Sequence, residues 1–311
     1  MGICDSNNDF LSNDKNYNKV KIDGVIKDLS TDYLLDNSIH SPITSKYKII
    51  GGGVGKGSYG EILMGIDKSG KQFAIKRMKK KKILKGQLLA NEVRIGTKMH
   101  HQNILGIKEV YEDIKTISFV MEYCDGGDLF DFITKNPQGK LDDINTIDIL
   151  IQILSALNYL HNEENICHRD LKPENFLISI SEQNRPIVKL IDFGFAQYIS
   201  KGQKMSGKIG SIMYMAPEIL KSQPYDEKID IWSAGVIFFN MITGCEPFSH
   251  GNLKNMEYNI LNKPINFELI KNNDLRNLCQ EMLERDPEKR IDSRNALKKA
   301  KIIKRKIFNE Y

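Results

Sequence analysis

The fold of this protein is decided by the stretch His168-Arg169-Asp170-Leu171-Lys172-Pro173-Glu174-Asn175. This stretch brings an acid, a cation and an amide together within a few positions. Shorter signatures accompany it in a set order along the chain, and they are Ala74-Ile75-Lys76, Glu92, Asp192-Phe193-Gly194 and Ala216-Pro217-Glu218. A single tripeptide could arise by chance, but chance does not account for the ordered set.

Upstream of these signatures lies a glycine-rich loop, Gly55-Lys56-Gly57-Ser58-Tyr59-Gly60. Its backbone could approach phosphates closely, because glycine carries no Cβ atom. Residues 61–66 and 72–78 alternate around a turn at 67–70, which predicts a hairpin after the loop. A dinucleotide-binding fold would need a helix there. A P-loop would need Gly at position 50 and Ser or Thr at position 57, so we exclude both classes.

Hydrophobic periodicity predicts an α+β fold with two lobes. Strands at 47–50, 61–66, 72–78, 104–111 and 116–121, with a helix over 85–99, give a small five-stranded antiparallel lobe. After the turn at 125–127 the chain is mainly helical, notably over 146–161 and 229–243, with short strands at 176–179 and 188–191. Residues 1–46 follow neither period, so we expect a disordered arm.

The ordered motifs resemble those of eukaryotic serine/threonine protein kinases, over roughly residues 47–300. The resemblance implies the two-lobed kinase fold, with a small lobe at 47–121, a hinge at 122–125, a large lobe at 126–301 and a tail at 302–311. It also implies transfer of the ATP γ-phosphate to Ser or Thr hydroxyls of protein substrates, with Mg²⁺ as the metal. The form of residues 170–175 is typical of serine/threonine and not of tyrosine kinases.

The resemblance assigns the catalytic residues. Lys76 would neutralise the α and β phosphates, and Glu92 would hold that lysine in place. Asp192 and Asn175 would supply oxygen ligands for Mg²⁺. In the same stretch as Asn175, Asp170 would orient the substrate hydroxyl and accept its proton, with Lys172 close to the γ-phosphate.

The nucleotide site follows from the same resemblance. Adenine is expected at the hinge segment 122–124, where Cys124 is a small hinge residue and Met121 closes the back of the pocket. The full set expected around the nucleotide and the adjoining substrate is Val54, Gly55, Lys56, Gly57, Gly60, Ile62, Ala74, Lys76, Met121, Glu122, Cys124, Asp128, Glu174, Leu177 and Asp192.

Two of these acids bear on substrate choice. Asp128 and Glu174 occupy positions that in basophilic kinases collect arginines upstream of the phosphorylated residue. Carboxylates pair with arginine in a bidentate manner, so we expect a preference for basic residues before the target. The alternative is that both are ordinary surface acids.

The first helix departs from the family pattern at Gly96, where a bulky apolar side chain is expected to stack with Ile107, His168 and Phe193. One hypothesis is that the missing side chain loosens the active position of this helix. The other is that a neighbour such as Met99 fills the space. Gly96 is also the feature that favours the rival function, a catalytically weak scaffold that binds ATP or partners.

The loop from 192 to 218 offers few hydroxyls. Ser211 matches a family position that supports Asp170. Gly207 lies where many relatives carry a phosphorylated Thr or an acid, so Arg169 would lack an anionic partner unless Ser206 is phosphorylated.

Segments 121–128, 190–194, 204–211 and 282–291 most resemble the calcium-dependent and calmodulin-dependent kinases. We find no EF-hand pattern, so we expect no calcium site in this chain. The basic segment 294–306 has apolar residues at helical spacing. It could bind a calmodulin-like regulator, or it could pack on the large lobe as a terminal helix.

The composition and the N-terminal residues indicate where in the cell the protein is expected. The net charge is +5, and the lysines are not interleaved with aromatic residues, so we expect no nucleic-acid partner. Scattered cysteines indicate a reducing, cytoplasmic setting, and no apolar run is long enough for a transmembrane helix. Gly2 fits an N-myristoylation pattern and Cys4 could accept palmitate, so we expect a monomer anchored to a membrane.

Overall fold

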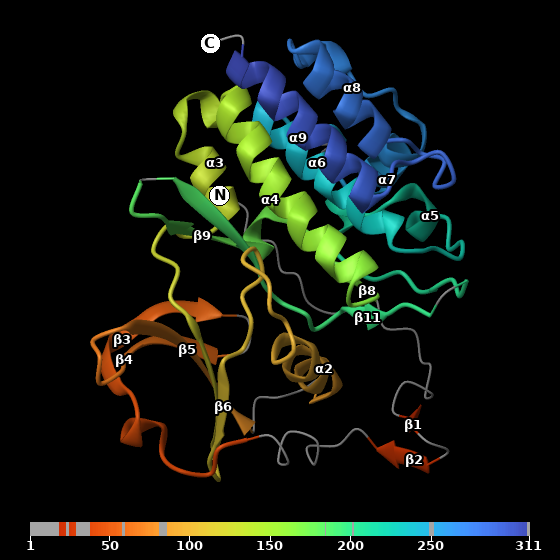
Figure 1. Ribbon diagram of the computed structural model, residues 1–311. Helices are drawn as coiled ribbons and strands as arrows, with labels where there is room; N and C mark the ends of the chain where they lie inside the picture. Colours follow the sequence, from red (N-terminus) through yellow and green to blue (C-terminus); the bar gives the residue numbers. More distant parts are fainter. Residues whose placement is uncertain are drawn as a thin grey trace.

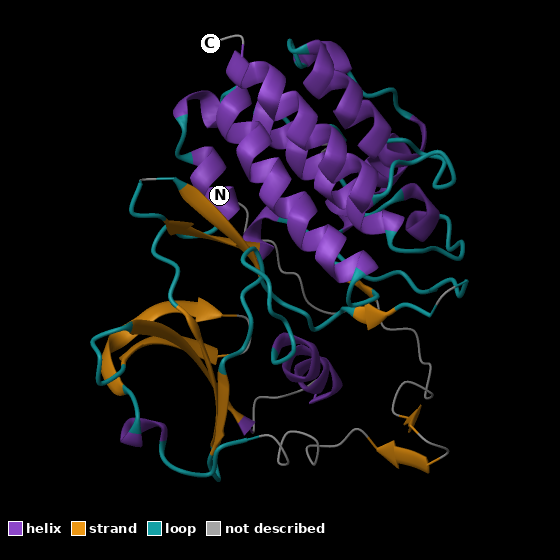
Figure 2. Ribbon diagram, in the orientation of Figure 1, coloured by secondary structure: helices purple, strands orange, loops and turns teal. Residues whose placement is uncertain are grey.

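The computed structural model describes residues 19–22, 25–28, 38–57, 60–80, 86–183, 185–200, 202–248 and 252–309. These residues form two lobes of different character (Figure 1). The smaller lobe is mostly sheet and the larger one mostly helix, as colouring by secondary structure shows (Figure 2). The predicted α+β fold is confirmed.

The small lobe is built on one antiparallel sheet. Its strands are β3 (Lys48–Gly57), β4 (Gly60–Ile66), β5 (Gln72–Lys79), β6 (Glu109–Glu112) and β7 (Thr116–Glu122), in the spatial order β3-β4-β5-β7-β6. The helix α2 (Gly86–Gly96) lies beside this sheet, on the side of the large lobe (Figure 1). The predicted strand at 104–111 begins only at Glu109, because the backbone of Ile104 and Leu105 pairs instead with Leu190 of the large lobe.

Alternation along β5 divides the sheet into two apolar faces. Phe73 and Ile75 point to one face, where they join a cluster with Tyr47 and Val120. Met78 points to the other face and packs with side chains of α2. The α2 face of the sheet also carries Lys76, and this placement brings the lysine toward the large lobe.

The large lobe contains the helices α3 (Leu129–Thr134), α4 (Asp143–Asn162), α5 (Pro217–Leu220), α6 (Lys228–Thr243), α7 (Leu253–Asn262), α8 (Asn273–Met282) and α9 (Ser293–Asn309). Its short strands are β8 (Ile166–Cys167), β9 (Phe176–Ile180), β10 (Pro186–Leu190) and β11 (Gln197–Tyr198). Single 3₁₀ turns are η1 (Ile43–Ser45), η3 (Pro137–Gly139), η4 (Pro173–Asn175), η5 (Ile212–Tyr214) and η6 (Phe267–Leu269).

The helix α6 forms the centre of the large lobe. Nearly all of its residues are buried, from Ile229 to Ile242, which is why this apolar run forms a core helix. At the end of the chain, α9 packs along α4 (Figure 1). It buries Ala296, Ala300, Ile303 and Ile307, so the terminal segment is a helix packed on the large lobe. Within the described residues, no helix is long and apolar enough to cross a membrane.

Part of the expected arm has regular structure. The strand β1 (Lys19–Ile22) pairs antiparallel with β2 (Val25–Asp28). Further on, Ile39 pairs with β6 at the edge of the sheet, through hydrogen bonds to Val110 and Glu112. Gly2 and Cys4 lie outside the described residues.

Candidate active site

One buried carboxylate, from α6, holds the loop between β8 and η4. Asp230 of α6 accepts hydrogen bonds from the backbone N–H groups of His168 at 2.8 Å and Arg169 at 2.9 Å. His161 contacts the same carboxylate at 2.9 Å. Burial alone would raise the pKa of Asp230, but these hydrogen bonds outweigh it and hold the pKa below the ordinary value. The charge on Asp230 thereby fixes the loop, in which Arg169 adopts a left-handed φ of 69°.

Asp170 is oriented by three residues that follow it in sequence. Its Oδ1 accepts hydrogen bonds from the N–H and the hydroxyl of Ser211, both at 2.9 Å. The side-chain amide of Asn175 donates to its backbone oxygen at 2.8 Å. Its Oδ2 lies 3.8 Å from Nζ of Lys172. Because Ser211 occupies Oδ1, Oδ2 is the oxygen left to act as a base.

The small lobe contributes an ion pair between a strand and a helix. Nζ of Lys76 in β5 lies 2.7 Å from Oε1 of Glu92 in α2, and both side chains are largely buried. Burial raises the pKa of Glu92, the charge of Asp192 raises it further, and Lys76 lowers it only in part. The pair therefore holds α2 against the sheet. Lys76 offsets part of the electrostatic cost of burying the charged Glu92.

Asp192 lies across from this pair in the turn 192–194. It has a left-handed φ of 67°, and its Oδ1 accepts a hydrogen bond from the N–H of Gly194 at 3.2 Å. The ring of Phe193 packs edge to face on His168, with centroids 5.4 Å apart. The side-chain amide of Asn91 in α2 donates to the carbonyls of Phe193, Gly194 and Ala196, so the two lobes meet at this turn.

The donor set suits Mg²⁺. Because Asn175 uses its Nδ2 to bind the backbone of Asp170, its Oδ1 is available to a cation. Asp192 offers a carboxylate. One amide and one carboxylate fit a small, hard cation that keeps waters and phosphate oxygens as its other ligands. Among the described residues, no group of three or more His, Cys, Asp or Glu side chains could form a full protein cage for a metal.

The register of the sheet gathers the expected nucleotide residues. Ile62 lies opposite Lys76, and Ala74 lies opposite Met121, so all four share the α2 face of the sheet. In the glycine loop, the backbone of 55–57 pairs with 60–62 as a hairpin, and no helix follows. A Cβ atom on Gly60 would collide with the carbonyl of Arg77, so only glycine fits there. The side chains of Val54 and Lys56 lie outside the described part of the chain.

The hinge carries one contact that sequence reasoning missed. Glu122 forms an ion pair with Lys189 of β10 at 2.7 Å, which ties the end of β7 to the large lobe. Lys189 stands in a strand with no charge pattern to single it out. Burial raises the pKa of the Cys124 thiol to about 12, so this cysteine behaves as a neutral hinge residue. Leu177, in β9, forms an isolated bridge with Asp128.

The two acids expected to bind substrate have different surroundings. Asp128 caps the N-terminus of α3, where its Oδ1 accepts a hydrogen bond from the N–H of Asp131 at 2.8 Å. Glu174 is exposed. Burial raises the pKa of Tyr214, and the negative charges of Glu174 and Glu246 raise it further. Glu246 thus lies in the same acidic region, which no motif indicated.

Gly96 does not leave a gap. A Cβ atom built on it would lie 2.9 Å from Cδ1 of Ile107, so the Ile107 side chain already fills this space. Met99, which we named as the filling neighbour, instead packs in the core of the large lobe. The hypothesis of a loosened helix therefore loses its structural basis.

Arg169 and Tyr225 bind the backbone of the segment after Asp192. Arg169 donates from Nε to the carbonyl of Phe195 at 2.7 Å. The hydroxyl of Tyr225 lies 3.2 Å from the carbonyl of Ser206 and 3.1 Å from that of Gly207. The side chain of Ser206 is exposed, and its modification stays a prediction.

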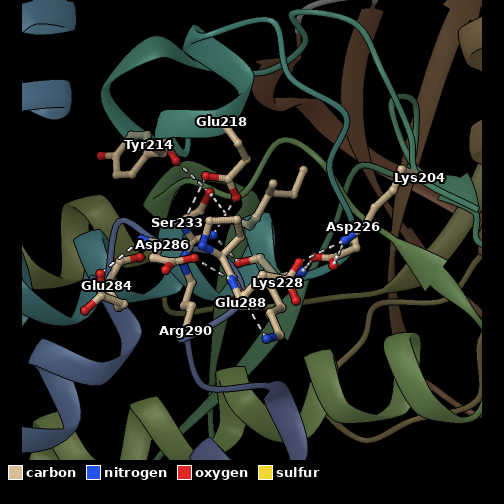
Figure 3. Close-up of polar contacts among 12 residues, drawn as sticks. Lys204, Tyr214, Glu218, Asp226, Lys228, Ser233, Glu284, Asp286, Glu288 and Arg290 are labelled. Carbon is tan, nitrogen blue, oxygen red and sulfur yellow. Dashed lines mark hydrogen bonds and ion pairs between the residues drawn. The ribbon is translucent and has the colours of Figure 1, made fainter. Parts of the chain in front are cut away.

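Further along, buried polar contacts tie this segment to α6 (Figure 3). Ser233 donates to the carbonyl of Tyr214 at 2.7 Å. Arg290 forms a bidentate pair with Glu218, at 2.7 and 3.0 Å, and both side chains are almost wholly buried. Ser211, which positions Asp170, thus belongs to a segment anchored in the core of the large lobe.

Comparison with known proteins agrees with this geometry. Residues 49–301 match the model of the protein kinase domain. Calcium-dependent protein kinase 5 of Plasmodium falciparum is 39% identical over 250 residues, which cover 79% of this chain and 43% of the relative. Calcium-dependent protein kinase 33 of Arabidopsis thaliana is 37% identical over 254 residues, covering 79% and 48%. The serine/threonine-protein kinase ULK3 of Xenopus laevis is 38% identical over 245 residues, covering 76% and 51%.

These matches establish the class. The chain belongs to the protein kinase family, and its domain is a protein serine/threonine kinase domain. The curated relatives are calcium-dependent kinases among others, and the chain spans about half of their length or less.

Proposed function

We propose that this protein transfers the γ-phosphate of ATP to serine or threonine hydroxyls of protein substrates. The observation that carries the proposal is the convergence of two groups from different lobes. Lys76 is paired with Glu92 of α2, and the neighbouring Asn91 donates hydrogen bonds to the backbone directly after Asp192, at the start of the loop that ends at Ser211. Such a site holds phosphates on one side and a base on the other.

Each residue has a definite role in this proposal. Lys76 neutralises the α and β phosphates, while Asp192 and Asn175 hold Mg²⁺, which screens the phosphate charge when bound. Oδ2 of Asp170 accepts the proton as the substrate oxygen bonds to the γ-phosphorus and the bond to ADP breaks. Lys172, 3.8 Å from that oxygen, stabilises the charge of the transferring group.

We further propose that substrates carry basic residues before the target. The support for this proposal is the acidic region formed by Glu174, Glu246 and Asp128. Only one oxygen of Asp128 is engaged by the helix N–H. Glu174 and Glu246 are exposed, and both act on Tyr214. An arginine placed there would gain bidentate, charge-assisted hydrogen bonds.

Both proposals are tested by initial rates on two serine peptides, one with arginines upstream of the serine and one with alanines there. We expect Mg-ATP-dependent phosphorylation that is lost in Asp170→Asn. Glu174→Gln and Glu246→Gln should raise KM for the arginine peptide several-fold and leave KM for the alanine peptide unchanged. Glu182→Gln, an exposed acid in the turn after β9, is the matched control.

Two outcomes would contradict these proposals. If the wild type is no faster than Asp170→Asn, the protein is a scaffold that binds ATP or partners. If both peptides respond alike to Glu174→Gln, the acids are ordinary surface groups. Running the assay with and without calcium also tests control by a calmodulin-like partner, which α9 would have to bind through its exposed basic side.

We also propose attachment to a membrane through acyl groups on Gly2 and Cys4. The support is the sequence Met1-Gly2-Ile3-Cys4-Asp5-Ser6. Two acyl chains are needed for stable anchoring, since one myristoyl chain binds only marginally. Mass spectrometry of the full chain from cells tests this, and Gly2→Ala should release the protein from membranes. An unmodified Gly2 would refute the proposal.

A further inference from the structure

Asn91, the residue before Glu92 in α2, contacts the turn that carries Asp192. Its Nδ2 lies 3.1 Å from the carbonyl of Phe193, 3.2 Å from that of Gly194 and 2.7 Å from that of Ala196. No motif in the sequence singled out this residue. One half-buried side chain of the helix thus faces three backbone acceptors within residues 193–196.

The orientation of this amide is set by a second residue. Arg94 donates from a terminal nitrogen to Oδ1 of Asn91 at 3.0 Å, and its guanidinium lies over the ring of Tyr198, 5.0 Å from the centroid. With Oδ1 facing a donor, Nδ2 must face the carbonyls. The two amide hydrogens serve three acceptors, of which the carbonyl of Ala196 is closest.

The same side of α2 also carries the catalytic ion pair. Positions 88, 91, 92 and 95 are neighbours on a helix surface. Leu88 packs against Gly194, since a Cβ atom built on that glycine would lie 3.8 Å from Cβ of Leu88. Glu92 holds Lys76. A movement of α2 that breaks the pair would therefore also pull Asn91 away from the turn.

The turn needs such support. Asp192 has a φ of 67°, a conformation that costs a residue with a side chain energy and persists only where its surroundings impose it. Hydrogen bonds to the carbonyls of 193, 194 and 196 restrain the backbone directly after Asp192. They come from the helix that holds Lys76.

We propose that Asn91 is a positioning residue that couples the active position of α2 to the metal-binding position of Asp192. This proposal rests on the proposed role of Asp192 as a ligand of Mg²⁺. When α2 is in place, the Asn91 amide holds the turn so that the Asp192 carboxylate faces the metal. When α2 moves, both the lysine and the metal ligand are lost together.

Asn91→Asp is the sharpest test. It keeps the oxygen that Arg94 binds, removes the amide donor and sets a carboxylate against three carbonyls. Asn91→Leu removes all of these bonds with little change in volume. In both variants we expect kcat to fall about tenfold and the Mg²⁺ concentration at half-maximal rate to rise several-fold. KM for the peptide should stay within about twofold.

A matched control is Asn262→Asp in α7, whose amide is exposed and donates only to the carbonyl of Tyr258 within its own helix. Its kinetics and Mg²⁺ dependence should match the wild type. If the Asn91 variants lose kcat with an unchanged Mg²⁺ dependence, the residue is merely structural and the proposal fails.

A second readout does not depend on turnover. A non-hydrolysable ATP analogue with Mg²⁺ should raise the melting temperature of the wild type more than the analogue with EDTA does. This gain from Mg²⁺ should shrink in Asn91→Asp and persist in Asp170→Asn. An equal gain in wild type and Asn91→Asp overturns the proposal, even if the wild type proves inactive as a kinase.

Discussion

The two helices that support the active site are held in opposite ways. In the large lobe, α6 is buried along almost its whole length, and Asp230 fixes the catalytic loop from within the core. In the small lobe, α2 packs on the sheet through residues such as Val93. Its links to the site are polar, from Glu92 to Lys76 and from Asn91 to the turn at 193–196.

This difference indicates which half of the site can move while the protein stays folded. Burial on all sides makes α6 part of the cooperative core, so loosening it means unfolding the large lobe. The apolar residues Leu89, Val93 and Ile95 of α2 are buried, but its polar contacts with the site are of modest net strength and can break while the core stays folded. We infer that Asp170, the proposed base, keeps its place, whereas Lys76 and Asp192 depend on the position of α2.

We expect the largest effect on stability from Glu218→Gln, because it breaks the buried ion pair between Glu218 and Arg290. This change leaves Arg290 buried without its anionic partner, and such losses cost about 3–5 kcal/mol. Urea unfolding monitored by fluorescence measures it. Glu288→Gln, an exposed acid nearby, should change the free energy of unfolding by less than about 0.5 kcal/mol. Equal effects of the two variants would disprove the importance of burial.

A large effect on rate without a matching effect on stability is expected from Glu92→Gln. Lys76 loses the charge that holds it, so kcat should fall about 10²-fold. The melting temperature should stay within a few degrees of the wild type, because the substitution leaves the apolar contacts of α2 in place, including that of Ile95 with the large-lobe core. The control is Glu61→Gln in β4, whose half-exposed carboxylate makes only a 3.9 Å ion contact with Arg77. A melting temperature that falls as far as in Glu218→Gln would refute the comparison.

A pair of glycines compares the two helices by the same substitution. In Gly235→Ala the new Cβ meets Cδ2 and Cγ of Leu283 at 3.0 Å within the α6–α8 contact, so we expect a loss of about 1–3 kcal/mol. In Gly96→Ala it meets only the flexible end of Ile107, which can rotate away. Better helix propensity offsets part of the cost, so the change should stay within about 1 kcal/mol. Thermal denaturation of both variants measures these losses of stability. A larger loss in Gly96→Ala than in Gly235→Ala would contradict the account.

The smallest effect is expected at the surface of the large lobe. Lys204 pairs with Asp226 at 2.6 Å and is 44% exposed, so Lys204→Met should cost less than about 1 kcal/mol. Burial raises the pKa of Asp226, but hydrogen bonds from Lys204 outweigh it and leave the pKa below the ordinary 3.8. Stability from a lowered pKa is present above the ordinary pKa and lost as pH falls through the folded one. The cost should therefore be equal at pH 7 and pH 5, and a smaller cost at pH 5 would contradict the assignment.

Sequence predicted the fold, because strand alternation and the ordered motifs are local signals, and the roles that it gives to the site residues stay predictions. It predicted the ends of elements less well, since Ile104 pairs with a residue far along the chain. It missed Asn91, Lys189 and Glu246, whose roles come only from what lies opposite them in space. It also left the space at Gly96 open between two hypotheses, because the direction of the Ile107 side chain is set by tertiary packing.

Hydrogen exchange tests the central claim most directly. Amides of α2 (86–96) and α6 (228–243) are followed in the same protein, with and without low concentrations of denaturant. The account predicts that α2 exchanges faster than α6, by an opening that denaturant hardly affects, and that Glu92→Gln speeds exchange in α2 alone. Equal protection of the two helices, with exchange in both following global unfolding, would contradict it.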